Sequence, residues 1–80
     1  MKIGGRIIQE KNISVNTENA FSATYKQHFI NVMLYKTFEG ENPEWDIDVR
    51  HYNGEIAAST IVKRCIIRDA IIYALDGALL

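Results

Sequence analysis

The sequence is poor in the residues that fix a small domain by covalent bonds or by rigid turns. Its 80 residues include one cysteine, Cys65, and one proline, Pro43, so no disulfide can form within the chain. No run of about 18 apolar residues is present, which is the length that a membrane-spanning helix needs. Residues 1–6 also lack the long apolar core of a signal peptide. We therefore expect a cytoplasmic protein that does not enter a membrane.

Charge of one sign is not in excess either. Nine basic and ten acidic residues give a formal net charge of −1, while 48% of the residues are hydrophobic and 24% are charged. This balance is typical of a globular domain and argues against intrinsic disorder. It also lacks the basic excess of most nucleic-acid-binding domains. Because 80 residues bury only one thin core, we expect a single domain over residues 1–80, with little chain left to build a catalytic cleft.

Residue groups typical of catalytic or metal sites are missing as well. The two histidines, His28 and His51, lie on different predicted strands, and Cys65 is far from both along the chain. Zinc sites that can be recognised in a sequence have four ligands at short paired spacings, and no serine is framed as a nucleophile elbow. We therefore expect no catalytic residue, no metal and no cofactor, and we interpret Cys65 as a buried packing residue.

Alternation of apolar and polar residues predicts strands in the middle of the chain. Residues 28–38 are apolar on both faces, which is typical of a central strand or of one covered on two sides. Apolar and polar side chains alternate along residues 45–52, which is typical of an antiparallel strand with one face exposed to solvent. Asn53-Gly54 then predicts a tight hairpin turn, followed by a short return strand at 55–57.

Two other segments are harder to assign. Residues 39–44 contain Gly40 and Pro43 and are interpreted as a turn. Residues 20–25 alternate as a strand does, but the cap-forming residues 16–19 before them also fit the start of a short helix. We favour the strand.

The last part of the chain predicts one helix that begins at Ser59 or Thr60 and ends near Asp76. A hydroxyl side chain is a good N-cap, and Gly77 suits the left-handed residue that ends many helices. At about 100° per residue, one broad apolar stripe would face the sheet. A second, narrower stripe would remain, formed by Ile61, Cys65 and Ile72. Either the N-terminal segment covers this stripe, or a second copy or another partner does.

The expected fold is α+β: an antiparallel three- to four-stranded sheet with a C-terminal helix packed on one face. Burial of each large apolar side chain contributes roughly 1.5–3 kcal/mol, which is a substantial share of a total stability of roughly 5–15 kcal/mol. The expected core consists of Ile30, Val32, Trp45, Ile47, Val49, Val62, Ile66, Ala70 and Tyr73.

The acidic residues are unevenly distributed. Half of the ten lie within ten positions, at Glu39, Glu41, Glu44, Asp46 and Asp48. The ordinary interpretation is a solvated hairpin, since charged turns and wet strand faces are common. The alternative is a surface that binds a basic partner, such as a nucleic-acid-binding complex, because complementary charge accelerates encounter and selects partners.

These observations favour a non-catalytic protein-binding module, either a homodimer through the C-terminal helix or a chain bound to another protein. The chain is similar to the small inhibitors that phages and mobile elements encode against host defence complexes, such as anti-CRISPR proteins. The similarity lies in its length, its expected α+β fold and its lack of recognisable sequence motifs. This resemblance covers the whole chain in size and format, and it implies a viral inhibitor.

Two alternative functions remain. Lys63, Arg64 and Arg68 lie near the predicted helix start, and strands followed by a helix with basic first turns resemble the double-stranded-RNA-binding domains. The chain lacks that family's first helix and dense lysine run. The resemblance implies a small nucleic-acid-binding protein whose affinity falls with salt. The other alternative is a small subunit of a larger enzyme.

Overall fold

Strands that pair with their neighbours along the chain make up most of the fold. The computed structural model describes residues 1–78. Their elements are β1 (Lys2–Ile3), β2 (Arg6–Ile7), the 3-10 turn η1 (Glu10–Asn12), β3 (Ile13–Asn16), β4 (Ala20–Tyr25), β5 (His28–Phe38), β6 (Glu41–His51), β7 (Ile56–Lys63) and α1 (Ile67–Ala78). β3 to β7 form one antiparallel sheet of five strands in sequence order, and β1 and β2 form a separate pair.

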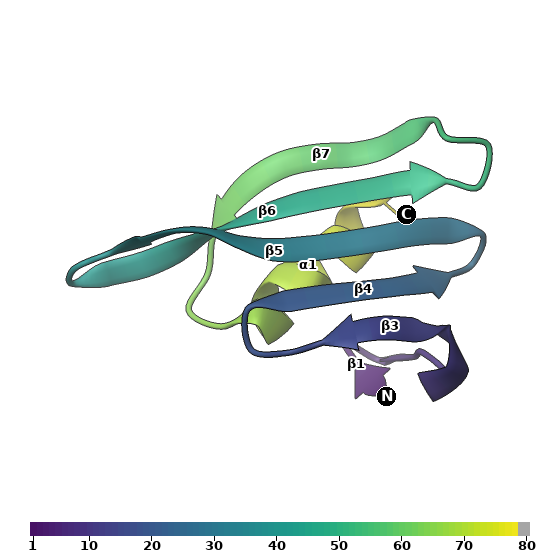
Figure 1. Ribbon diagram of the computed structural model, residues 1–80, viewed down its shortest axis with the longest axis horizontal. Coiled ribbons are helices and arrows are strands. Elements are labelled where there is room, and N and C mark those ends of the chain that lie inside the picture. The colour runs from purple at the N-terminus through teal and green to yellow at the C-terminus, as the bar shows by residue number, and fades with distance from the viewer. Residues whose placement is uncertain (79–80) are drawn as a thin grey trace.

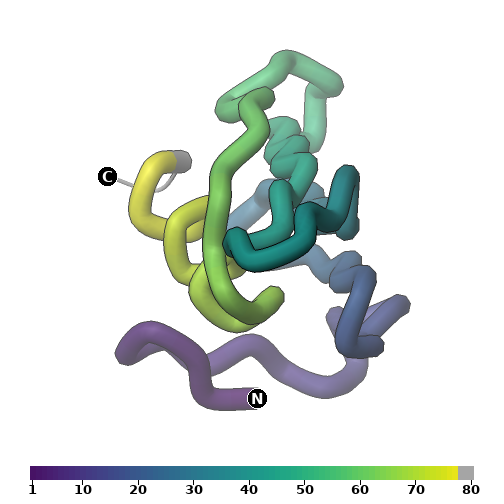
Figure 2. Tube along the Cα trace, turned by 90° about the vertical axis from the view of Figure 1, so that its left-hand side faces the viewer, coloured from purple at the N-terminus to yellow at the C-terminus, as the bar shows by residue number. Residues whose placement is uncertain are grey.

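The sheet and the helix form two layers. α1 lies behind the sheet in Figure 1, and the view in Figure 2 shows the helix on one side of the sheet only. The α+β class is therefore confirmed, although the main sheet has five strands instead of three to four. The strand favoured for residues 20–25 is also confirmed, as β4.

Glycines with positive backbone angles form two of the hairpin turns. Gly40 (φ +75°) joins β5 to β6, and Gly54 (φ +92°) joins β6 to β7. Glycine adopts such angles with little strain because it has no Cβ. The turn predicted at Asn53-Gly54 is confirmed, and Asn53 Oδ1 accepts a hydrogen bond from the Glu55 amide at 2.9 Å.

The turn predicted at residues 39–44 is shorter than expected. Asn42, Pro43 and Glu44 belong to β6, which begins at Glu41. Proline has no N–H to donate to a neighbouring strand, and it is tolerated in a sheet where the pairing is irregular. The pairing of β5 with β6 is irregular in this region, so the hairpin continues past the proline to a tip at residues 39–40.

The predicted helix start is wrong, because Ser59 and Thr60 lie inside β7, which pairs with β6. Thr60, Ile61 and Val62 are three β-branched residues in succession, and such residues favour strands. α1 begins only at Ile67. The apolar residues between these points fitted both a helical stripe and a strand, and pairing with β6 is what selects the strand.

The later start of α1 changes which of its residues face the sheet. Ile71 and Leu75 are buried, whereas Ile66 precedes the helix and is 51% exposed. Tyr73 is 41% exposed, so neither Ile66 nor Tyr73 is a core residue as predicted. Gly77 lies inside α1, which ends at Ala78, and it does not have the left-handed conformation expected of it.

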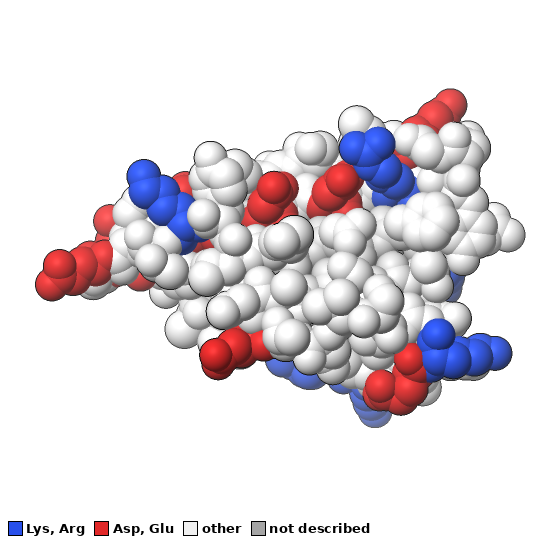
Figure 3. Space-filling model, in the orientation of Figure 1, with Lys and Arg blue, Asp and Glu red and all other residues white. Residues whose placement is uncertain are grey.

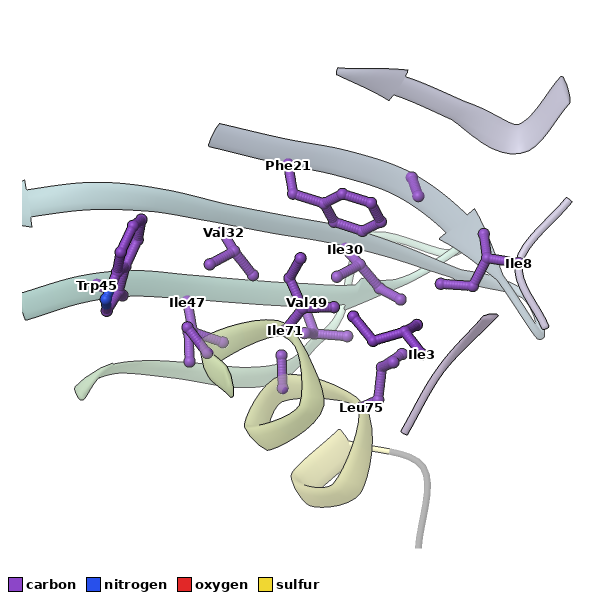
Figure 4. Packing of buried hydrophobic residues seen from close by; sticks show 13 residues of the cluster. Ile3, Ile8, Phe21, Ile30, Val32, Trp45, Ile47, Val49, Ile71 and Leu75 are labelled. Atoms are coloured by element: carbon purple, nitrogen blue, oxygen red, sulfur yellow. The ribbon is translucent and has the colours of Figure 1, made fainter. Parts of the chain in front are cut away.

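The core lies between α1, the inner face of the sheet and the N-terminal strands (Figure 4). The predicted core residues that are buried are Ile30, Val32, Trp45, Ile47, Val49 and Ala70. Val62 is only partly buried. The buried residues that were not predicted are Ile3, Ile8, Phe21, Ala23, Ile71, Ala74 and Leu75.

β1, β2 and the turn between them close one end of this core beside α1 (Figure 2). Ile3 is 1% exposed. Gly4 lies so close to Ile72 that a Cβ at position 4 would be 3.1 Å from Ile72 Cγ1. Arg6 Nη1 donates a hydrogen bond to Asp76 Oδ1 at 2.8 Å. The N-terminal segment therefore covers the part of α1 around Ile72, as the first of the two alternatives for that residue predicts.

Candidate protein-binding surface

The face of the sheet that points away from α1 is uncovered in the part of the chain that the structure describes, and we call it the open face. It is the side seen in Figure 1 and in Figure 3. Side chains alternate between the two faces along a strand, so the residues between the buried ones point to it. Its central part consists of Ala20, Ser22 and Thr24 of β4, Phe29, Asn31 and Met33 of β5, Asp46, Asp48 and Arg50 of β6, and Ser59 and Ile61 of β7.

Large apolar side chains lie on the open face. Met33 is 56% exposed, and Phe29 and Ile61 are each 45% exposed. The Phe29 ring also packs near the ring of Tyr52, with 4.9 Å between their centres. Met33 and Ile61 lie on either side of Asp46, because each is its direct partner across the sheet. Clusters of exposed apolar side chains often mark interaction surfaces.

The sequence indicated this apolar face but not its exposure. Phe29 and Met33 belong to the second apolar face predicted for a central strand, and β5 is indeed the central strand of the five. The single helix of the described chain covers only the other face. The alternation of apolar residues in 28–38 was therefore the signal that located this surface.

The acidic residues fall into two places. Glu39 and Glu41 lie at the tip of the β5–β6 hairpin, and Asp46 and Asp48 lie on the open face. The outward direction predicted for these two aspartates is confirmed. Figure 3 shows acidic side chains over β6, surrounded mostly by uncharged surface and, toward the upper right, in contact with a basic side chain. Glu44, between the two groups, is half-buried.

Only part of this negative charge is compensated. Lys63 Nζ lies 3.0 Å from Glu41 Oε1, and Arg50 Nε lies 3.2 Å from Asp48 Oδ2. Both pairs are largely exposed, so each contributes less than about 1 kcal/mol to stability. Within residues 1–78, the acids of this group that are in no ion pair are Glu39, Glu44 and Asp46. Asp46 therefore places unpaired negative charge between two apolar side chains.

The second helical stripe predicted from Ile61, Cys65 and Ile72 does not exist. Ile61 lies on β7, Cys65 lies in the connection between β7 and α1, and only Ile72 lies on α1. Cys65 is an exposed free thiol, so its predicted burial is wrong. A dimer through this stripe has no structural basis, and of the three residues only Ile61 belongs to the open face.

The three cations of the nucleic-acid hypothesis do not share a helical face either. Arg68 alone lies in α1, since Lys63 ends β7 and Arg64 follows it. Lys63 pairs with Glu41. The guanidinium carbon of Arg64 lies 4.9 Å from the centre of the Tyr73 ring. Two of the three side chains are thus engaged within the protein.

The fold brings the two histidines together. His28 and His51 are direct partners across β5 and β6, and their ring centres are 4.5 Å apart. His28 Nδ1 lies 2.7 Å from the carbonyl oxygen of Lys26. Within residues 1–78, no third His, Cys, Asp or Glu side chain joins such a pair to form a group that could hold a metal ion.

The described residues include no helix long and apolar enough to cross a bilayer. Comparisons of the chain with protein-family models, with curated proteins and with solved structures give no significant match. The function therefore has to be argued from the surface of the molecule itself.

Proposed function

We propose that the protein is a non-catalytic protein-binding module that binds a basic partner through its open face. The observation that carries the proposal is the row Met33–Asp46–Ile61, in which a carboxylate lies between two exposed apolar side chains on adjacent strands. A lysine or arginine side chain has the matching form, since its alkyl stem packs on apolar surface while its charge meets the carboxylate.

The wider surface supports the same kind of partner. Glu44 and Asp48 precede and follow Asp46 on the same side of β6, and Phe29 adds apolar area beside them. An apolar patch with an excess of negative charge fits a partner that presents cations around an apolar contact. Attraction between opposite charges also raises the rate of encounter and makes it sensitive to salt.

A protein with a basic nucleic-acid-binding site has this chemistry. One form of this function is a small inhibitor of a host defence complex. The open face of the inhibitor would occupy the basic site of its partner and compete there with nucleic acid. A small subunit of a larger enzyme would use the same surface to bind its partner. The two cases differ in whether added nucleic acid displaces the module.

The experiment is a tagged pull-down from source-cell lysate, with nuclease treatment and two matched variants. Met33→Asp adds a carboxylate beside Asp46 and removes the apolar contact for the stem of a bound lysine or arginine, and we expect it to abolish retention of the partner. Ile66→Asp changes a residue of similar exposure that lies just before α1, and we expect it to retain the partner. Equal retention by both folded variants would sink the proposal.

A further inference from the structure

The two edges of the main sheet differ in how far they are protected. β3 and β7 are the edge strands, because each has a single neighbour in the sheet. β3 has four residues and an irregularity in its pairing with β4. β7 has eight residues and is the uppermost strand in Figure 1, and no strand of the described chain pairs with its outer side. A long edge of this kind is a template for an additional strand.

The usual devices against strand pairing are almost absent from β7. Proteins protect their edges with proline, with charged side chains, with bulges or by keeping the strand short. From Ile56 to Val62 the strand contains no proline and no charged residue. Its one irregularity lies near its first residues, opposite Val49 and Arg50 of β6, and its pairing with β6 is regular from Ala58 onward.

The regular part of β7 directs backbone groups outward at Ser59 and Ile61. The amide and carbonyl groups of a residue in an antiparallel strand point to the same side, and this side alternates from one residue to the next. The Arg64 amide, directly after β7, donates to the carbonyl oxygen of Pro43 in β6 at 3.2 Å. The backbone groups of Ser59 and Ile61 therefore point away from β6. Both residues are exposed, so an added strand could form hydrogen bonds with them.

Acidic side chains of β6 lie next to these two residues on the open face. Ile61 is the direct partner of Asp46, and Ser59 is the direct partner of Asp48. Asp46 is in no ion pair within residues 1–78, while Asp48 pairs with Arg50. Residues directly opposite each other in a sheet share a face. A side chain of an added strand opposite Ile61 or Ser59 would therefore point to the open face and lie in line with one of these acids.

The distance to the acids determines which side chains fit. An added strand would lie about 9.6 Å from β6, which is two strand spacings. A lysine or arginine opposite Ile61 can extend its alkyl stem over that side chain so that its charge approaches Asp46. A second basic side chain, two positions along the added strand, can pass over the small Ser59 toward Asp48.

We therefore propose that β7 binds an extended segment of the partner as an additional antiparallel strand, with basic side chains at alternate positions directed toward Asp46 and Asp48. Proteins bind extended peptides in this way through main-chain hydrogen bonds, while side chains at alternate positions set specificity. Antiparallel pairing is slightly more stable per residue than parallel pairing. The inference rests on the proposed function and specifies the form in which the basic partner binds.

The first test uses two short synthetic peptides, TVKVKVT and TVEVEVT, capped at both ends and differing only in the charge of one face. Fluorescence anisotropy of the labelled peptides measures their affinities. We expect the lysine peptide to bind at least about tenfold more tightly than the glutamate peptide at low salt. At saturating lysine peptide, hydrogen exchange at the Ser59 and Ile61 amides should slow at least about tenfold, because these amides then donate to the added strand.

A matched pair of variants tests the edge itself. Ser59→Pro removes an outward-pointing amide without removing a bond to β6, and proline is tolerated at such positions of edge strands. We expect it to weaken binding of the lysine peptide at least about tenfold. Ser59→Ala keeps the amide and should bind within about threefold of the unmodified chain. Asp46→Asn, which removes the charge alone, should weaken the lysine peptide at least about threefold. Far-ultraviolet circular dichroism checks that the variants fold.

The outcomes separate this inference from the proposed function. If the pull-down loses the partner with Met33→Asp but not with Ser59→Pro, the open face binds the partner without an added strand, and the inference alone is overturned. It is also overturned by equal binding of the two peptides, by no binding of the lysine peptide, or by equal binding to Ser59→Pro and Ser59→Ala. If Met33→Asp retains the partner as Ile66→Asp does, the proposed function fails instead.

Discussion

The indole Nε1 of Trp45 donates a hydrogen bond to the carbonyl oxygen of Arg64 at 2.9 Å. Trp45 is a core residue of β6, and Arg64 is the first residue after β7. The Arg64 amide in turn donates to the carbonyl oxygen of Pro43 at 3.2 Å. Two hydrogen bonds to β6 therefore hold the point at which the chain leaves the sheet and turns toward α1.

We expect Trp45→Phe to lower the free energy of unfolding by about 2 kcal/mol, because it removes the hydrogen bond and part of the buried ring. Urea unfolding followed by far-ultraviolet circular dichroism measures this, since the substitution removes the only tryptophan of the sequence. Arg64→Ala keeps the accepting carbonyl and should cost less than about 1 kcal/mol. Equal costs for the two variants would contradict this role of the indole.

The same region shows why the sequence did not predict the end of the sheet. Ile61, Val62, Ile66 and Ile67 are apolar at spacings that fit a helix, and the run also fits a strand. What decides between them is pairing with β6 across the hairpin at Asn53-Gly54, together with the bonds that Arg64 makes. Local periodicity carries no information about either.

Only the part of the candidate site that depends on local strand geometry was predictable from the sequence. Alternation along β6 correctly placed Asp46 and Asp48 on the outward face, because that pattern depends only on strand geometry. Whether Met33 is covered depends on which face of the sheet α1 packs against, and α1 packs against the other face. The burial of Ile3 was not predictable from its two-residue strand, since it comes from contact with distant parts of the chain.

The N-terminal strands should contribute to stability through packing. Ile3 is 1% exposed and Ile7 is 68% exposed, so the two provide a matched pair in adjacent strands. We expect Ile3→Ala to lower the free energy of unfolding by about 2–4 kcal/mol, and Ile7→Ala to change it by less than about 0.5 kcal/mol. Denaturant unfolding of both variants tests this. A small effect of Ile3→Ala would mean that the N-terminal strands are not part of the core.

The turn between β4 and β5 should carry backbone strain. Lys26 and Gln27 have φ angles of +46° and +64°, although neither is glycine. A left-handed conformation costs a residue with a Cβ roughly 1–2 kcal/mol, so Gln27→Gly should raise the free energy of unfolding by about 0.5–1 kcal/mol. Gly54→Ala, at a positive φ in the next-but-one turn, should lower it by a similar amount. Changes of the same sign in both variants would refute this account.

The charge of the open face should control how fast a basic partner binds. Asp46 is in no ion pair within residues 1–78 and lies between Met33 and Ile61. Asp46→Lys reverses one charge at the centre of the surface while the apolar neighbours remain. Once the partner is isolated, we expect this variant to associate at least about tenfold more slowly at low salt.

The dependence on salt distinguishes this role from a loss of packing. At 1 M salt the Debye length is about 3 Å, so the association rates of the variant and the unmodified chain should converge there. Arg6→Glu, a charge reversal beside α1 and away from the open face, serves as the control and should associate at the normal rate. Surface plasmon resonance at several salt concentrations gives these rates. If Asp46→Lys and Arg6→Glu behave alike, the partner does not bind at the row Met33–Asp46–Ile61, and the acidic hairpin tip at Glu39 and Glu41 becomes the next surface to test.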